Sequence, residues 1–476
     1  MTRLNRRRVL AGVGGAALLG LAGAGGYLSR VPVGLLNGRS RARPVLGEDT
    51  LPPAVDVVII GGGYVGTSAA LTLAERGVSV ALCEKGVVAG EASGRSMGYL
   101  DSQLLSPLKL DLVARSKALW AAMNERTGLE SGYRPTGLVE SLGSPDEEAG
   151  AEAWLKLINA RPTLDGRIIR GAELRELFPQ VSHPPAAALY TPTDASVEPQ
   201  LAAPAMADAA RNKGASILQN CAVRGLETKA GAIAGVVTEK GPIACRSVIL
   251  AGGAWSSLFA RSLGISIPQL HVYLSMMGLS EIKGPTIPLS AEGYGFRPQI
   301  DGRYSFGVVD FAAPISPNTL QNIARLKPAI DAFWPIAHVG FSPTEFWREL
   351  NTPTHWALDA PSPFESRRIL VPEFREGPLT QALLKLRQDF PIFQDAVIRE
   401  RWAGVISAFP DNMPIISPIS RIPGLYLGTG FTYGLTMGPA AGEALADLVT
   451  GKTPQFALKP YRWERFTDGS PIVFQG

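Results

Sequence analysis

Residues 55–84 constrain the fold of this chain more than any other stretch of its 476 residues. An apolar run over 57–60 is typical of a strand buried on both faces, and three glycines follow it with the G-x-G-x-x-G spacing of a strand-to-helix turn. A helical interval and a second apolar run over 78–83 complete a βαβ unit. The sequence therefore predicts a dinucleotide-binding unit, and a glycine-rich turn that binds no ligand is the alternative.

The three glycines have separate roles in such a unit. Gly61 permits the tight turn, Gly63 lets the backbone approach a pyrophosphate, and Gly66 lets the helix pack closely on the strand. The N-terminus of the helix then directs its positive end at the phosphates. Glu84, about 20 residues farther on, ends the second strand where a carboxylate accepts hydrogen bonds from a ribose.

The charge of the chain is uneven because of an arginine-rich leader. Eight arginines and no acidic residue fall within residues 1–47, which leaves 38 basic against 42 acidic residues in the rest of the chain. A cationic start, Asn-Arg-Arg-Arg, precedes an uncharged run over 9–29, as in a twin-arginine export signal. The run is long enough to cross a bilayer. We expect a retained membrane anchor, and a signal peptide cleaved near residues 22–24 is the alternative.

The remaining composition argues against several classes of protein. The mildly acidic body shows no cluster of basic residues of the kind that binds nucleic acid. Three cysteines (Cys83, Cys221 and Cys245) and four histidines lack the spacing of metal ligands. We therefore expect structural thiols, and no zinc site, haem attachment site or Cys/His catalytic pair.

Three further segments rich in small residues accompany the βαβ unit, over 90–98, 251–256 and 428–442. Together the four segments resemble those of the D-amino-acid oxidase, glycine oxidase and sarcosine oxidase superfamily, in which they surround one FAD. The likeness extends over residues 55–451 and implies that this chain binds FAD. The segment 90–98 contains no Cys or His, so we expect non-covalent binding.

Within that superfamily the chain looks most like the membrane-anchored L-amino-acid deaminases of Proteus. The leader, Arg-Gly-Leu-Glu-Thr-Lys-Ala-Gly over 224–231 and Thr-His-Trp-Ala-Leu-Asp-Ala-Pro-Ser-Pro-Phe-Glu over 354–365 carry this likeness. The resemblance implies an anchored dehydrogenase that passes electrons to the respiratory chain. Three features depart from the pattern. The deaminases' carboxylate-binding arginine aligns with Val309, and a glutamine of their pocket aligns with Tyr99. The loop over 430–436 is longer than theirs and nearer to that of other amine oxidases.

We expect an α/β protein whose two domains alternate along the chain. The first is a Rossmann-like FAD-binding domain with a mixed sheet flanked by helices, over residues 54–101, 195–270 and 395–455. The second is an α+β substrate domain with an antiparallel sheet, over residues 102–194 and 271–394. The remaining parts are a leader or anchor (1–30), a linker (31–53) and a C-terminal tail (456–476).

Residues 315–372 differ in character because proline and aromatic residues are frequent there. We expect a loop-rich wall of the substrate domain, since exposed clusters of aromatic residues are the rarer arrangement. The alternative is a surface that meets the membrane or a partner.

The predicted FAD-binding residues come from all four segments and from neighbouring strands. A last helix, expected from about Gly438 to Thr450, directs its positive end at the flavin, where negative charge develops on reduction. The predicted residues are Gly61, Gly63, Tyr64, Val65, Gly66, Glu84, Lys85, Ser93, Gly94, Arg95, Ser96, Gly98, Val223, Ala251, Gly252, Trp255, Gly404, Gly430, Phe431, Gly434, Leu435 and Thr436.

The substrate site needs few protein groups, because a bound flavin takes a hydride from the carbon next to a neutral amine. A substrate carboxylate calls for a bidentate arginine, and Arg297 is the candidate, with a surface salt bridge as the alternative. Tyr433, Tyr99 and Met97 are expected to line the pocket, and Trp402 either lines it or lies in the core. No general base is predicted.

The expected reaction is oxidative deamination of an amino acid, with L-amino acids favoured, to a 2-oxo acid and ammonia. The expected partners are the substrate, a quinone or cytochrome and the lipid bilayer of a bacterial inner membrane, with the catalytic part in the periplasm. Three alternatives remain: a peroxide-producing oxidase of the glycine or sarcosine type, a nicotinamide enzyme, and a flavin-carrying subunit without turnover. The nicotinamide enzyme leaves the segments 90–98 and 428–442 unexplained.

Overall fold

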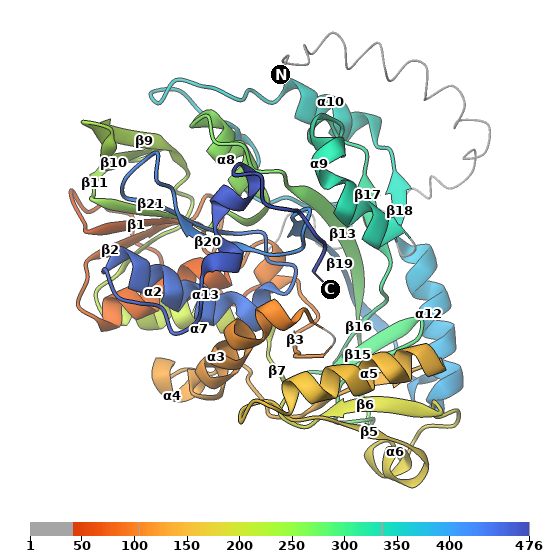
Figure 1. The fold of residues 1–476 in the computed structure, drawn as a ribbon. Helices are drawn as coiled ribbons and strands as arrows, with labels where there is room; N and C mark the ends of the chain where they lie inside the picture. The colour runs from red at the N-terminus through yellow and green to blue at the C-terminus, as the bar shows by residue number, and fades with distance from the viewer. Residues whose placement is uncertain (1–40, 104, 335–336, 476) are drawn as a thin grey trace.

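The computed structural model describes residues 41–103, 105–334 and 337–475. The predicted leader and membrane anchor lie outside these residues. Within the described part of the chain, no helix combines the length and the apolar character needed to cross a membrane. Figure 1 shows two sheets side by side, one around β1 and the other around the long strands β13 (Leu270–Leu279) and β19 (Ile398–Ala408).

The first sheet is built around the predicted βαβ unit. Its six strands have the order β20-β21-β12-β1-β2-β8, and all neighbours are parallel except β20 and β21. The strands are β1 (Val57–Ile60), β2 (Val80–Cys83), β8 (Ser216–Leu218), β12 (Ser247–Leu250), β20 (Ile415–Pro418) and β21 (Leu425–Thr429). In a sheet of this kind the parallel strands all end at one edge, which is where ligands bind.

Layers of different kinds cover the two faces of the first sheet (Figure 1). Val57 and Ile59 of β1 pack toward helices, whereas Val58 packs toward the other face. The helices are α2 (Tyr64–Glu75), α7 (Pro199–Asn212) and α13 (Gly434–Val449). The other face is covered by α8 (Ser256–Ser262) and a three-stranded sheet of β9 (Val223–Lys229), β10 (Ala232–Thr238) and β11 (Gly241–Ala244). The Rossmann-like mixed sheet flanked by helices is thereby confirmed.

Helix α13 begins one turn earlier than predicted, at Gly434 instead of about Gly438. Pro439 has no backbone N–H to donate to the carbonyl of Leu435. The loss of this hydrogen bond would normally break the helix at that point. The indole N–H of Trp120 donates to that carbonyl instead, at 2.9 Å. The helix therefore continues through the proline, and the predicted residues 434–436 form its first turn.

The second sheet has ten strands in the order β18-β17-β13-β16-β15-β14-β4-β6-β5, with β19 on the other side of β13. Its pairs are antiparallel except β14 with β4 and β17 with β18, as expected for an α+β domain. Besides β13 and β19, the strands are β4 (Leu138–Leu142), β5 (Arg167–Ile169), β6 (Ala187–Thr191), β14 (Leu289–Ala291), β15 (Tyr294–Pro298), β16 (Tyr304–Gly307), β17 (Phe311–Pro314) and β18 (Ala337–Gly340).

Five helices and a small two-stranded sheet surround these layers. The helices are α3 (Leu110–Ala121), α4 (Met123–Thr127), α5 (Pro145–Ile158), α6 (Gly171–Leu177) and α12 (Glu376–Asp389). The small sheet pairs β3 (Tyr99–Leu100) with β7 (Ala195–Ser196), where the chain crosses between the two larger sheets.

Strand β19 corrects the predicted start of the last FAD-binding segment at residue 395. The strand pairs with β13 from Ile398 to Ala408, so it belongs to the second sheet, and the chain returns to the first sheet only at β20. Alternation of side chains along a strand identifies the strand but not the sheet that it joins.

The loops expected over residues 315–372 are largely helices, namely α9 (Pro317–Phe333), α10 (Pro343–Asn351) and α11 (Pro363–Ser366). Each of these helices has a proline at its first position, where no backbone N–H is needed. Ser316 and Ser342 precede α9 and α10, and their side chains accept hydrogen bonds from the first turns. Ser362 precedes α11 and forms a capping box with Glu365. The prolines therefore start helices in this region and do not interrupt them.

Candidate active site

The candidate site lies at the edge where the parallel strands of the first sheet end. Small-residue segments follow β1, β2 and β12, and the N-termini of α2 and α13 begin there. Strand β19 of the second sheet contacts the segment 90–98 at this edge. If Gly404 of β19 carried a Cβ, that atom would lie 3.4 Å from the Cβ of Arg95. The site is therefore enclosed by both sheets.

The βαβ turn has the geometry that its glycines predict. Gly61 has a φ of +113°, and a Cβ there would lie 2.4 Å from the carbonyl oxygen of Ala251. A Cβ on Gly66 would lie 2.0 Å from the carbonyl oxygen of Gly61. Only glycine fits at these two positions, so the start of α2 is held close to the ends of β1 and β12.

Ser93 lies against this turn from the segment 90–98. Its hydroxyl accepts a hydrogen bond from the backbone N–H of Tyr64 at 3.1 Å, and a Cβ on Gly63 would lie 2.9 Å from the same oxygen. The hydroxyl group therefore reaches the N-terminus of α2, where a pyrophosphate would bind.

Glu84 is positioned by backbone donors at the end of β2. Its two carboxylate oxygens accept hydrogen bonds from the N–H groups of Gly62 at 2.8 Å and of Gly86 at 2.7 Å. Burial raises the pKa of Glu84, while Lys85 and the two N–H groups act in the opposite direction. This carboxylate retains lone pairs that a ribose hydroxyl can use.

A small cavity beside Glu84 has aromatic walls. The rings of Trp255, Phe259 and Phe364 belong to its lining. Its other lining residues are Ile60, Gly61, Cys83, Lys85, Val223, Leu250 and Gly252. Apolar and aromatic walls next to a ribose-binding acid are suited to the adenosine half of a dinucleotide.

The segments that border the opposite half of the ligand contain buried polar atoms with no hydrogen-bond partner among the described residues. These include Nη2 of Arg95 and the hydroxyl of Thr432. Trp120 fixes the first turn of α13, and the hydroxyl of Thr436 accepts from the N–H of Asp101 at 3.3 Å. A negatively charged flavin ring requires hydrogen-bond donors and positive charge nearby. The unpaired donors and the positive N-terminus of α13 supply both, so the residues present fit FAD.

Arg297 does not have the role that the sequence suggested. Its Nη1 and Nη2 donate to the two oxygens of Glu198 at 2.8 and 3.0 Å, and its Nε donates to the carbonyl of Met97 at 2.6 Å. The side chains of the pair are only 1% and 5% exposed. The guanidinium is therefore committed to a buried ion pair, which is neither a carboxylate site nor the surface salt bridge of the alternative.

Trp402 lies in the core of the interface between the sheets. Its side chain is 3% exposed, and its indole N–H donates to the carbonyl of Arg95 at 2.9 Å. The guanidinium of Arg41 lies 3.6 Å from the centre of its ring. Trp402 thus supports the segment 90–98 from behind.

Tyr99 and Met97 lie beside the strands of the second sheet. The hydroxyl of Tyr99 lies 2.8 Å from the carbonyl oxygen of Leu289, and burial raises the pKa of this tyrosine. The methyl group of Met97 approaches β16, since a Cβ on Gly307 would lie 2.8 Å from it. Both side chains belong to the wall where the second sheet faces the candidate site.

Tyr433 lies near two titratable residues, Lys109 and Asp101, that were not predicted from the sequence. It directly precedes α13, and the ammonium nitrogen of the fully buried Lys109 lies 5.8 Å from the centre of its ring. Asp101 also faces Tyr433, and its Oδ1 has no hydrogen-bond partner among the described residues. Burial raises the pKa of Asp101. Lys109 follows an ordinary amphipathic pattern, so only its burial in the structure distinguishes it from a surface lysine.

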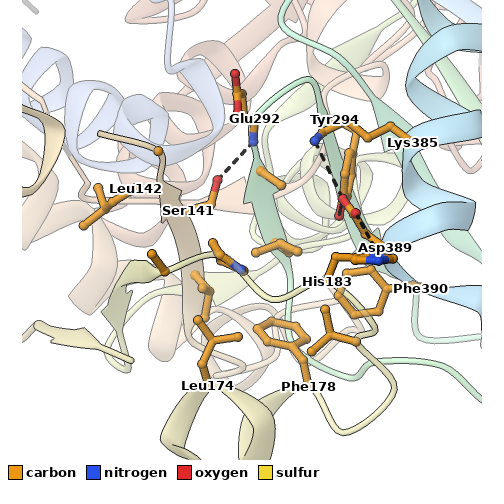
Figure 2. Close-up of a pocket in the computed structure, with 17 residues that line it drawn as sticks. Ser141, Leu142, Leu174, Phe178, His183, Glu292, Tyr294, Lys385, Asp389 and Phe390 are labelled. Atoms are coloured by element: carbon orange, nitrogen blue, oxygen red, sulfur yellow. Dashed lines mark hydrogen bonds and ion pairs between the residues drawn. The ribbon is translucent and has the colours of Figure 1, made fainter. Parts of the chain in front are cut away.

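A larger cavity, of about 260 Å³, lies elsewhere, against the second sheet (Figure 2). Leu174, Phe178 and Phe390 form its apolar side, and the hydroxyl of Tyr294 donates to Asp389 at 2.9 Å on its polar side. None of the predicted site residues lines this cavity. It therefore takes no part in the candidate active site.

Residues 56–448 match the family model described as FAD dependent oxidoreductase (DAO). The chain is 37% identical to the L-amino acid deaminase from Proteus myxofaciens in complex with anthranilate, with a TM-score of 0.88 over 90% of this chain and 97% of that one.

Two curated relatives are more distant. Glycine oxidase from Pseudomonas putida is 26% identical over 85% of this chain and 97% of that protein. Mitochondrial sarcosine dehydrogenase from Mus musculus is 24% identical over 87% of this chain, and the match spans 42% of that protein's length.

Proposed function

The chain belongs to the DAO family of FAD-dependent oxidoreductases, and from this premise we propose that it oxidatively deaminates L-amino acids to 2-oxo acids and ammonia. The observation that carries the proposal is the likeness to the Proteus myxofaciens L-amino acid deaminase at 37% identity over nearly the full length of both chains. The likeness includes the second sheet, which faces the substrate, as well as the FAD-binding layers.

Bound FAD supplies the hydride acceptor, and the protein binds, orients and shields the reactants. The βαβ turn and Ser93 would hold the pyrophosphate, and Glu84 would hold a ribose. The N–H groups of Gly434 and Leu435, in the first turn of α13, would stabilise negative charge on a bound flavin. We propose that the FAD is held without a covalent bond.

The leader and the region 315–372 support a membrane location for this activity. A twin-arginine start and an uncharged run over 9–29 suit export and anchoring, with the catalytic part in the periplasm. Trp334, Phe341 and Trp347 on and beside α9 and α10 are 65%, 53% and 50% exposed, which suits contact with lipid. We propose that the electrons pass from the flavin to a membrane quinone or cytochrome.

The test is anaerobic bleaching of the flavin absorbance of the purified protein by a panel of substrates. The panel contains L-amino acids, their D-enantiomers, glycine and sarcosine. Bleaching by L-amino acids, with release of 2-oxo acid and ammonia, is the expected result. Bleaching by glycine or sarcosine alone would replace the substrate class, and a flavin that nothing reduces would favour the non-catalytic flavin-carrying subunit.

A second measurement separates the electron acceptors and the mode of flavin binding. Under air, peroxide should remain low in the absence of membranes, and a soluble quinone analogue should restore turnover. Stoichiometric peroxide would instead identify an oxidase. Acid precipitation should release all of the FAD into the supernatant, whereas flavin retained in the pellet would show a covalent bond.

A further inference from the structure

The C-terminal segment 470–475 ends between the two sheets (Figure 1). The N–H of Gln475 donates to the carbonyl of Asp411 at 3.0 Å, and its side-chain oxygen accepts from the hydroxyl of Ser106 at 2.8 Å. Next to it, the ring of Phe474 packs edge-on against Phe333 of α9 at 5.3 Å. The segment thus joins the loops of the candidate site to the helical region of the second sheet.

Lys109 is the charged group that this segment covers. Its side chain is fully buried, and its ammonium group donates to the backbone carbonyl of Gln475 at 2.7 Å. Burial lowers the pKa of Lys109 to about 8, although Asp411 and Asp101 act in the opposite direction. Asp411 is itself bonded to Arg465 at 2.6 Å, so its charge is shared with another cation.

We propose that Lys109 binds the carboxylate of the substrate, and that residues 470–475 form a strap whose backbone carbonyl occupies Lys109 until substrate displaces it. This inference rests on the proposed function, since it assigns a substrate-binding residue and an access route to the same site. Arg297 is committed to Glu198, and Val309 has no charge, so neither of these two positions supplies the expected bidentate arginine.

The exchange is chemically reasonable at Lys109. A carbonyl oxygen and a carboxylate oxygen both accept from an ammonium group, and the carboxylate forms the stronger, charge-assisted bond. Tyr433 places Lys109 next to the first turn of α13, which is where the flavin would lie. The strap is held by few contacts on its outer side, because Val473 is 59% exposed.

The first experiment titrates the flavin absorbance of the holoenzyme with anthranilate, the carboxylate bound by the Proteus myxofaciens deaminase. Deleting residues 471–476 should tighten binding about tenfold, because the competing carbonyl is removed. Lys109→Met should weaken binding about tenfold to a hundredfold in the full-length and in the truncated protein, the range expected for a charge-assisted hydrogen bond. Lys109→Arg should restore part of the affinity.

Matched controls separate these effects from loss of structure. Lys452→Met removes an exposed lysine outside the strap and should bind anthranilate as the parent does. The neutral anthranilamide should bind the Lys109→Met variant and the parent equally. Equal affinity of the truncated protein with and without Lys109→Met would overturn the assignment of Lys109, and unchanged or weaker binding after truncation would overturn the strap.

Hydrogen exchange gives a readout that does not depend on turnover. The N–H of Gln475 is bonded to Asp411, so anthranilate should accelerate its exchange if the strap is displaced. Binding without faster exchange would contradict displacement. A protein whose flavin no amino acid reduces, but which shows both effects, would contradict the proposed function and leave the carboxylate site intact.

Discussion

At the scale of single residues, Arg297 and Glu198 form a cross-link between the segment 90–98 and the start of α7. The guanidinium bonds both carboxylate oxygens of Glu198 and the carbonyl of Met97. Because both charges are buried, removing one leaves the other without a partner, which costs far more than replacing the whole pair by apolar groups. The pair should therefore behave as a structural unit.

We predict that Arg297→Met lowers the free energy of unfolding by about 3–5 kcal/mol, the usual cost of breaking a buried ion pair. The double variant Arg297→Met, Glu198→Leu should recover most of that loss. Urea denaturation followed by circular dichroism provides the measurement. If Arg297 bound the substrate carboxylate instead, the single variant would keep its stability and show a raised KM.

Lys109 provides a pH prediction, because burial lowers its pKa to about 8. A carboxylate is attracted only to the protonated form of Lys109. The affinity for anthranilate should therefore be highest well below pH 8 and should fall as the pH rises above 8. The decrease approaches tenfold per pH unit once the lysine is mostly neutral. Asp101, Asp411 and Tyr433 face the same ammonium group. The pKa values of Asp101 and Tyr433 are raised, so each of these two groups loses its proton at a higher pH than an exposed group would.

Flavin absorbance titrations with anthranilate between pH 6.5 and 9.5 measure this profile. Lys109→Arg is the control, because an arginine stays protonated over the whole range and should flatten the curve. An unchanged slope in that variant would assign the pH dependence to another group.

At the scale of helices and strands, three helices, α7, α9 and α13, contain an internal proline and remain regular. In two of them another segment supplies the missing hydrogen-bond donor. Pro204 in α7 leaves the carbonyl of Gln200 without its usual donor, and the backbone N–H of Arg43 donates to it at 2.8 Å. Pro439 in α13 leaves the carbonyl of Leu435, which accepts from Trp120. Pro204 and Pro439 are therefore compatible with their helices, because another segment supplies the missing donor.

We predict that Trp120→Phe destabilises the protein more in the parent than in a Pro439→Ala background. In the parent it leaves the buried carbonyl of Leu435 unpaired, at a cost of about 1–3 kcal/mol in addition to lost packing. In the alanine background the new N–H of residue 439 can donate to that carbonyl. A double-mutant cycle of urea unfolding isolates this coupling, and additive effects would contradict the compensation.

Much of the FAD-binding part could be predicted, because its signals are local. The apolar strands, the glycines at fixed spacing and the acid after β2 lie within one short stretch, and each reports a backbone requirement such as the positive φ of Gly61. The small-residue segments 90–98 and 251–256 also lie at the predicted edge, since the parallel strands before them end there.

The features that sequence did not predict depend on contacts between distant residues. Glu198 and Arg297 are far apart in the chain, and nothing in either neighbourhood indicates that they pair. Strand β19 joins the second sheet through β13, which local alternation cannot show. The prolines in the region 315–372 suggested loops. A proline at the first position of a capped helix instead marks where that helix begins.

At the scale of the whole molecule, residues 41–43, within the predicted linker, connect the two sheets. Arg41 lies on the ring of Trp402 and bonds Glu400 of β19 at 2.7 Å, so it belongs to the second sheet. Arg43 bonds Asp208 of α7 at 2.6 Å, so it belongs to the helical layer of the first sheet. Burial lowers the pKa of Arg41, which Glu400 opposes.

We predict that the point at which the N-terminal segment is cut decides the stability of the body. Deletion of residues 2–40 keeps the arginine contacts and serves as the reference. Deleting residues 2–44 should lower the melting temperature by a few degrees relative to that reference, because the cation–π contact, two ion pairs and the donor to the carbonyl of Gln200 are lost together. Arg41→Ala should reproduce part of the loss, and Arg399→Ala, at an exposed position, should not. Equal melting temperatures for the two deletions, measured by circular dichroism, would show that the sheets are held together without this segment.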